Sequence, residues 1–325
     1  MLRIFVALAL ALGCAVSGAQ ELSLFAGGLK ESGVDEKTPV WAFEYQQGLG
    51  EHFAGSFSWL NEGHVPRHHR DGQAVQLWTR TNVLDRSLSL ALGVGPYRYF
   101  DTTVSTAGGS YANIHGWATV GSLEATWYTR SRWLYQLRLN RILADNSIST
   151  SSIMLGVGYQ LEPVSERGPR DHAPYQLDKT TTNEITGFLG ATIVNSYESE
   201  HDAARALEFR HGIARYVDVT VGLMNEGDPR LVRRTGVTTQ LWLVREVLAN
   251  EKLILGVGVG PYFSIDRYHT PAPGEAGNRD VSLIVTASAA YRISPHWDAR
   301  FSWNRIDTDY NRDTDVVMFG LGYRF

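Results

Sequence analysis

The sequence predicts an all-β fold: a transmembrane up-and-down antiparallel β-barrel protein made of two tandem eight-strand units. Three observations support this prediction. Apolar and polar residues alternate over segments of about 10 residues, the length that a tilted strand needs to cross a bilayer. The chain repeats itself at an offset of about 164 residues. No later stretch holds about 20 consecutive apolar residues, which argues against membrane-spanning helices.

The first 19 residues have the three parts of a secretory signal peptide. Arg3 supplies the positive charge, residues 4–16 form a short apolar stretch, and Ser17-Gly18-Ala19 is a small-residue cleavage site. The apolar stretch is too short to span a bilayer comfortably as a helix. We therefore expect residues 1–19 to be removed and the mature chain to begin near Gln20.

The first copy of the repeat divides into eight candidate strands. Connections after even-numbered strands are short, as at Glu51-His52, whereas those after odd-numbered strands are longer and polar, as in residues 64–72. Short turns at one end and long loops at the other are typical of a barrel that crosses a membrane. The candidate strands lie near residues 21–30, 39–48, 53–62, 73–83, 87–99, 115–128, 132–142 and 151–161.

The second copy repeats short blocks of the first in the same order. Six blocks of the first copy recur: Glu44-Tyr45, Asn61-Glu62-Gly63, Gln76-Leu77-Trp78, residues 93–97, Asn140-Arg141-Ile142 and residues 154–159. Their counterparts in the second copy are, in the same order, Glu208-Phe209, Asn225-Glu226-Gly227, Gln240-Leu241-Trp242, residues 258–262, Asn304-Arg305-Ile306 and residues 318–323. Between the copies, residues 162–183 contain three prolines and many polar residues, which indicates a linker. The predicted units are therefore residues 20–161 and 184–325.

Alternation also predicts which face of each strand meets lipid. In residues 132–142, Trp133, Tyr135 and Leu137 share one face, while Gln136 and Arg138 share the other. The matching strand of the second copy places Trp297 and Phe301 opposite Asp298 and Arg300. An apolar exterior around a polar interior is the reverse of a soluble barrel.

Sixteen strands can close as one wide barrel or as two narrow ones, and we favour two barrels. Consecutive strands of one barrel need only a tight turn, which residues 162–183 greatly exceed. Interior positions such as Gly93 and Gly156 are small, as a narrow barrel requires. Charges of opposite sign, such as Glu44 and Arg138, could pair inside it. A single sixteen-strand barrel is the alternative.

The last residues, 319–325, have an apolar side chain at every second position and end in Phe325. With the N-terminal segment and the alternating strands, this pattern resembles the bacterial outer-membrane β-barrel superfamily, here as a tandem duplication of the small eight-strand type. The resemblance covers the mature chain at the level of pattern. It implies the outer membrane of a Gram-negative bacterium, insertion by the barrel-assembly machinery, a periplasmic linker, and contact with membrane lipid and lipopolysaccharide.

The stretch from Asn61 to Asp71 is the densest group of chemically active side chains. Its candidate catalytic residues are Glu62, His64, His68, His69 and Asp71. They could place a general base against a lipid phosphate or an acyl ester, or hold a metal ion. In the second copy the three histidines and Asp71 become Asp228, Val232, Arg233 and Thr235. We therefore favour a structural role, with Glu62 as an inward carboxylate paired with Arg138 or Arg141, and assign no metal.

Arg141 and Arg305 end the seventh strand of each copy and are candidates for binding lipopolysaccharide phosphate. The formal net charge of −4 and the lack of a basic tract argue against nucleic acid as a partner, and no motif calls for a cofactor. We favour a non-enzymatic protein with surface-exposed loops, acting in envelope structure, adhesion or lipopolysaccharide contact. The alternatives are a lipid A-modifying deacylase or acyltransferase and a diffusion porin.

Overall fold

The computed structural model describes residues 20–32, 37–65, 67–104, 111–161, 164, 166–169, 181–196, 198–247, 252–269 and 280–325. The predicted signal peptide lies outside these residues, as does most of the predicted linker. The described strands form two closed barrels, unit one from the first copy of the repeat and unit two from the second. No helix in this part of the chain is long and apolar enough to cross a membrane.

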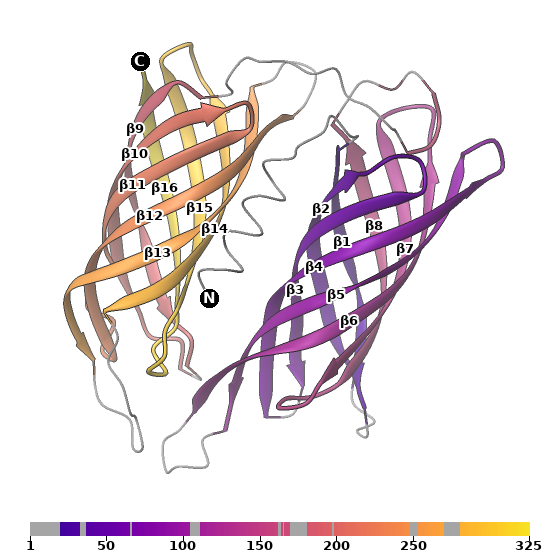
Figure 1. Cartoon of the computed structure of the whole chain (residues 1–325). Coiled ribbons are helices and arrows are strands. Elements are labelled where there is room, and N and C mark those ends of the chain that lie inside the picture. The colour runs from indigo at the N-terminus through magenta and orange to yellow at the C-terminus, as the bar shows by residue number, and fades with distance from the viewer. Residues whose placement is uncertain are drawn as a thin grey trace. The chain divides into compact units, whose positions relative to one another are not determined.

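Unit one is a closed barrel of eight antiparallel strands in sequence order (Figure 1). β1 pairs with β2 along one edge and with β8 along the other, which closes the barrel. Its strands are β1 (Gln20–Glu31), β2 (Lys37–Gly48), β3 (Phe53–Val65), β4 (His68–Val83), β5 (Leu88–Thr103), β6 (Ala112–Tyr128), β7 (Trp133–Ala144) and β8 (Thr150–Gln160).

Unit two is a second closed barrel with the same strand order. β9 pairs with β10 and with β16, so this barrel closes on its own strands. Two barrels are therefore confirmed over a single sixteen-strand barrel. The strands are β9 (Asn183–Val194), β10 (His201–Ala214), β11 (Val217–Asn225), β12 (Val232–Val247), β13 (Leu253–His269), β14 (Val281–Arg292), β15 (Trp297–Asp307) and β16 (Thr314–Arg324).

The outward faces are apolar, as alternation predicts. Large apolar side chains are exposed along the strands of both units, with Leu155 at 69% and Leu189 at 73% exposure. An edge-to-face aromatic pair lies at the end of each unit where the short turns connect the strands, which we call the turn end. This pair is Trp133 with Tyr159 in unit one, at 5.2 Å between ring centroids, and Trp297 with Tyr323 in unit two, at 5.1 Å. Aromatic rings at this position are typical of a membrane interface.

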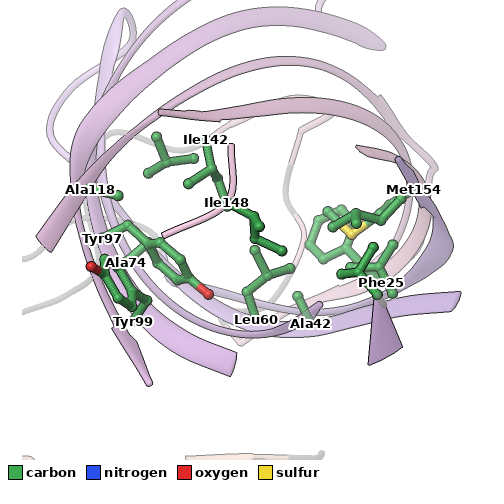
Figure 2. Packing of buried hydrophobic residues seen from close by; sticks show 14 residues of the cluster. Phe25, Ala42, Leu60, Ala74, Tyr97, Tyr99, Ala118, Ile142, Ile148 and Met154 are labelled. Atoms are coloured by element: carbon green, nitrogen blue, oxygen red, sulfur yellow. The ribbon is translucent and has the colours of Figure 1, made fainter. Parts of the chain in front are cut away.

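The interiors are narrow and filled. A side chain at Gly93 would collide with Trp78, since its Cβ would lie 2.5 Å from the indole, and Gly258 stands in the same relation to Trp242. An apolar cluster fills one part of unit one, and Figure 2 shows Leu60, Tyr97 and Met154 entering it from different strands. Polar side chains fill much of the rest, so the core of each barrel is made by inward residues at every second strand position.

The strands of unit one extend further than alternation predicts at the end opposite the aromatic pair, which we call the loop end. Residues 64–72 were expected to form a loop, but β3 continues to Val65 and β4 begins at His68. That expectation was wrong because a polar composition was taken as a sign of a loop. A hairpin that projects beyond the apolar belt is solvated on its outer face and needs no apolar residues there.

Candidate functional site at the loop end of unit one

The repeated block Asn61-Glu62-Gly63 forms a β-bulge in β3. The register with β4 shifts between Asn61 and His64, and Gly63 has a φ of +69°. The Gly63 backbone N–H donates to Asn61 Oδ1 at 3.0 Å. Unit two repeats this turn, because Gly227 has a φ of +73° and its N–H donates to Asn225 Oδ1 at 3.3 Å. The block therefore has a structural role: it bends the strand and holds the glutamate inward.

Glu62 is fully engaged inside the barrel. Arg70 on β4 forms a two-pronged ion pair with it, which includes an Nη2–Oε1 distance of 2.8 Å, and both side chains are completely buried. Tyr97 and Thr150 donate hydroxyl hydrogen bonds to the same carboxylate at 3.0 and 2.5 Å. The predicted pairing of Glu62 with Arg138 or Arg141 was therefore wrong. Arg70, Tyr97 and Thr150 together donate four hydrogen bonds to the carboxylate, which leaves its oxygens little room to contact a substrate.

Unit two contains the same buried ion pair. Arg234 Nε and Nη2 donate to the two oxygens of Glu226, each at 2.8 Å, and both side chains are fully buried. Thr314 donates to Glu226 at 2.7 Å, as Thr150 does to Glu62. In each unit the arginine also donates to a backbone carbonyl of the connection before the last strand, Ile148 in unit one and Arg312 in unit two. The pair thus links the β3–β4 hairpin to the β7–β8 connection in unit one, and β12 to the β15–β16 connection in unit two.

The structure divides the candidate catalytic residues between two faces. Glu62 and His68 lie on the interior side, whereas His64 and His69 face outward on neighbouring strands, directly opposite each other in the register. Asp71 follows two positions after His69, in register with Asn61. An acid–base pair of Glu62 with His64 or His69 would have to act through the barrel wall.

His68 has a different partner, one that the sequence reasoning missed. Its Nδ1 lies 2.8 Å from Asp101 Oδ2, and the Ser147 hydroxyl donates to the same oxygen at 2.8 Å. Asp101 belongs to β5 and Ser147 to the connection between β7 and β8, so this group links β4 and β5 to that connection at the loop end. Asp101 stood at the start of a predicted loop, and nothing in the sequence pairs it with His68.

A second charged cluster lies deeper in unit one. Arg138 bridges two carboxylates, with Nη1 at 2.8 Å from Glu44 and Nε at 2.7 Å from Glu124. Its guanidinium carbon lies 4.1 Å from the ring centroid of Phe25 and 4.9 Å from that of Trp78. The expectation that Glu44 and Arg138 pair inside the barrel was therefore right, and Glu124 is a further partner of Arg138. Charge pairing and ring stacking together compensate a buried cation for its lost hydration.

The two arginines predicted to bind lipopolysaccharide have different surroundings. Arg141 is exposed and donates to Ser32 and Ser151, at 2.6 and 2.9 Å. Arg305 instead pairs with Asp315, at 2.7 Å. Of the two candidates, Arg305 is therefore bound to a carboxylate, whereas Arg141 is bound to two hydroxyl groups.

Arg141 belongs to a row of cations on the outward face of unit one. It is in register with Ser151 of β8, Ser151 with Lys30 of β1, and Lys30 with Lys37 of β2. Lys30, Lys37 and Arg141 are exposed and lie at the loop end. We call these three residues the cation row. The four matching positions in unit two are Arg305, Asp315, Ile193 and His201, in which an acid offsets the arginine.

These features define a class of protein. Each unit is a closed antiparallel barrel with an apolar exterior and a charged, filled interior, which is the arrangement of a small transmembrane β-barrel. The class follows from the strand pairing and from the two faces of the strands.

Comparison with known proteins adds little to this assignment. No protein-family model and no curated protein matches the sequence. The solved structures that resemble the chain include the N-terminal β-barrel domain of OprF from Pseudomonas aeruginosa, with 12% identity, a TM-score of 0.34 and coverage of 44% of this chain and 98% of that one. Ail, the attachment invasion locus protein of Yersinia pestis, has 13% identity and a TM-score of 0.34, covering 45% of this chain and 99% of that one. The CymD monoaromatic hydrocarbon channel has 10% identity and a TM-score of 0.26, covering 95% and 89%. These scores are too low to carry an argument about function.

Proposed function

We propose that the chain is an integral outer-membrane protein of a Gram-negative bacterium with a non-enzymatic role in envelope structure. In this proposal two filled barrels anchor the protein, present its loops at the cell surface, and contact the anionic groups of lipopolysaccharide. One observation carries the proposal: both barrels keep the same buried ion pair, Glu62 with Arg70 and Glu226 with Arg234. The most chemically suggestive carboxylate of the sequence is thereby explained by folding.

The repeated hydrogen bonds support a filled interior in both units. In unit one Gln76 donates to Ser122, and Ser122 to Asn140; in unit two Gln240 donates to Thr286, and Thr286 to Asn304, each pair 164 residues later. Trp78 donates to Ser56 and Trp242 to Thr220 in the same way. A cavity of about 20 Å³ inside unit two, beside Arg210 and Trp242, has room for about one water molecule. Such interiors favour an anchor over a diffusion pore.

The cation row supports contact with lipopolysaccharide. Along β8 the outward face runs from Tyr159 in the aromatic pair to Ser151 in the row, eight residues or about 26 Å of strand. Strand tilt shortens this span toward the height of an apolar belt. The row therefore stands where the belt ends, at the level at which an outer leaflet would present its phosphate groups.

Single-channel recording of the refolded mature protein in a planar bilayer tests this proposal. We expect a silent membrane while the protein remains folded, as judged by heat-modifiable electrophoretic mobility. Stable porin-sized current steps would refute the filled-barrel proposal. In parallel, mass spectrometry of lipid A from cells with and without the protein should show no difference, and a new deacylated or acylated species would favour the enzymatic alternative.

A further inference from the structure

Two imidazole rings meet on the outward face of the β3–β4 hairpin in unit one. His64 and His69 are directly opposite in the strand register, their ring centroids are 4.1 Å apart, and the ring planes are inclined by 30°. Water reaches both rings, since His64 is exposed and His69 is partly exposed. The pair lies on the other side of the barrel wall from Glu62, so the interior ion pair does not account for it.

We propose that His64 and His69 bind one divalent late transition-metal ion, and we expect Zn²⁺ or Cu²⁺. Neutral imidazole nitrogen is a good ligand for both ions, at about 2.0–2.1 Å from zinc. Directly opposite residues of an antiparallel pair have Cβ atoms about 4.5–5.5 Å apart, which allows one nitrogen from each ring to reach the same ion. Water completes the coordination, because the hairpin supplies two protein ligands.

The backbone holds this pair in place before any ion arrives. The bulge at Gly63 sets the direction of the next residue, and the His64 backbone N–H donates to Thr38 Oγ1 at 3.1 Å. The buried Glu62–Arg70 pair, next to the histidines along the hairpin, holds β3 and β4 together. Because the backbone is fixed, only the two rings need to turn toward the ion, and less conformational entropy is lost on binding.

The other copy of the repeat provides an internal comparison. The positions that match His64 and His69 are Asp228 and Arg233, and Asp228 lies beyond the end of β11. The third histidine of the stretch, His68, faces inward to Asp101. The proposed site therefore belongs to unit one and consists of two of its three clustered histidines.

Isothermal titration of Zn²⁺ into the refolded, tag-free mature protein tests the proposal. We expect one ion per chain, with affinity lowered at least about tenfold by His64→Gln and by His69→Gln. The control is His296→Gln, which removes an exposed histidine of unit two that stacks on Tyr323, and it should leave binding unchanged. Electron paramagnetic resonance of the Cu²⁺ complex should show coupling to two nitrogens in the parent and to one in each variant.

Absence of stoichiometric binding to the parent protein would overturn the proposal, as would equal binding by the parent and His64→Gln. Heat-modifiable mobility and far-ultraviolet circular dichroism will show that each variant is folded, which is expected because both rings contact solvent. This proposal does not depend on the proposed function. A conducting protein with a zinc site would refute only the filled barrel, and a silent one without the site would refute only the metal proposal.

Discussion

At the scale of single residues, the Glu62–Arg70 pair couples three parts of the loop end. The two side chains come from neighbouring strands, and Arg70 reaches across to the carbonyl of Ile148 before β8. Both charges are fully buried, so each depends on the other for compensation. Removing one charge leaves the other uncompensated in the interior, which is much costlier than losing an exposed pair.

Glu62→Gln should therefore lower the free energy of unfolding by about 3 kcal/mol. The measurement is urea unfolding of the protein in lipid vesicles, followed by tryptophan fluorescence. The control is Glu51→Gln, which breaks the partly exposed Glu51–Arg86 pair of the same unit and should cost at most about 1 kcal/mol. A Glu62→Gln protein of full stability that has lost an activity on lipid A would instead support the enzymatic alternative.

At the scale of strands, the two faces differ in how well the sequence predicts them. The outward face follows from alternation alone, and Trp133, Leu155 and Trp297 lie where that pattern puts them. The interior pairs do not follow, because a charged residue on an inward face can reach several strands. Glu62 was expected to pair with Arg138 or Arg141, but it pairs with Arg70 of the neighbouring strand.

The candidate site shows the same limit. Composition identified the histidine-rich stretch, but the division of its residues between two faces depends on the bulge at Gly63. A one-residue shift of register reverses the face of every side chain beyond it. The repeat of Asn-Glu-Gly in both copies was the available signal, and it favoured a structural role for Glu62 without revealing Arg70 as the partner.

A charge placed midway along the outward face of a strand should be strongly destabilising. Leu155 lies on β8 about midway between Tyr159 and Ser151, and Leu155→Arg should cost about 2–4 kcal/mol in vesicles. The control is Thr119→Arg, at an exposed outward position of β6 in register with Leu143 beyond the cation row, where about 0–1 kcal/mol is expected. Equal costs for the two substitutions would mean that no apolar medium surrounds the strands.

The cation row extends from β7 to β2, and its contact with lipopolysaccharide can be tested separately. The triple variant Lys30→Gln, Lys37→Gln, Arg141→Gln should bind lipopolysaccharide several-fold more weakly than the parent in a surface-plasmon-resonance assay. Dephosphorylated lipopolysaccharide should bind weakly to both proteins, and added salt should reduce binding to the parent most. Arg305→Gln is the control, since Arg305 is already paired with Asp315. Undiminished binding by the triple variant would exclude the row as the contact.

At the scale of the whole molecule, each barrel closes on its own strands, so the described strands of one unit complete no sheet of the other. Substitutions inside the two units should consequently act independently. Glu62→Gln should therefore shift only the unfolding transition of unit one, and Glu226→Gln only that of unit two, so that the double variant shows both shifts. A single urea transition that moves with either substitution would show that the two barrels unfold as one cooperative body.

The arginine that stacks on the interior tryptophan differs between the two copies of the repeat. Trp78 and Trp242 occupy matching positions, but the cation over Trp78 is Arg138 of β7, whereas the cation over Trp242 is Arg210 of β10. The residue that matches Arg138 is Ser302, and the residue that matches Arg210 is Gln46. The tryptophan is therefore the same in the two copies, while the cation over it comes from different strands. The cation beside the tryptophan thus differs in position between two barrels of the same fold, whereas the buried pairs Glu62–Arg70 and Glu226–Arg234 occupy matching positions.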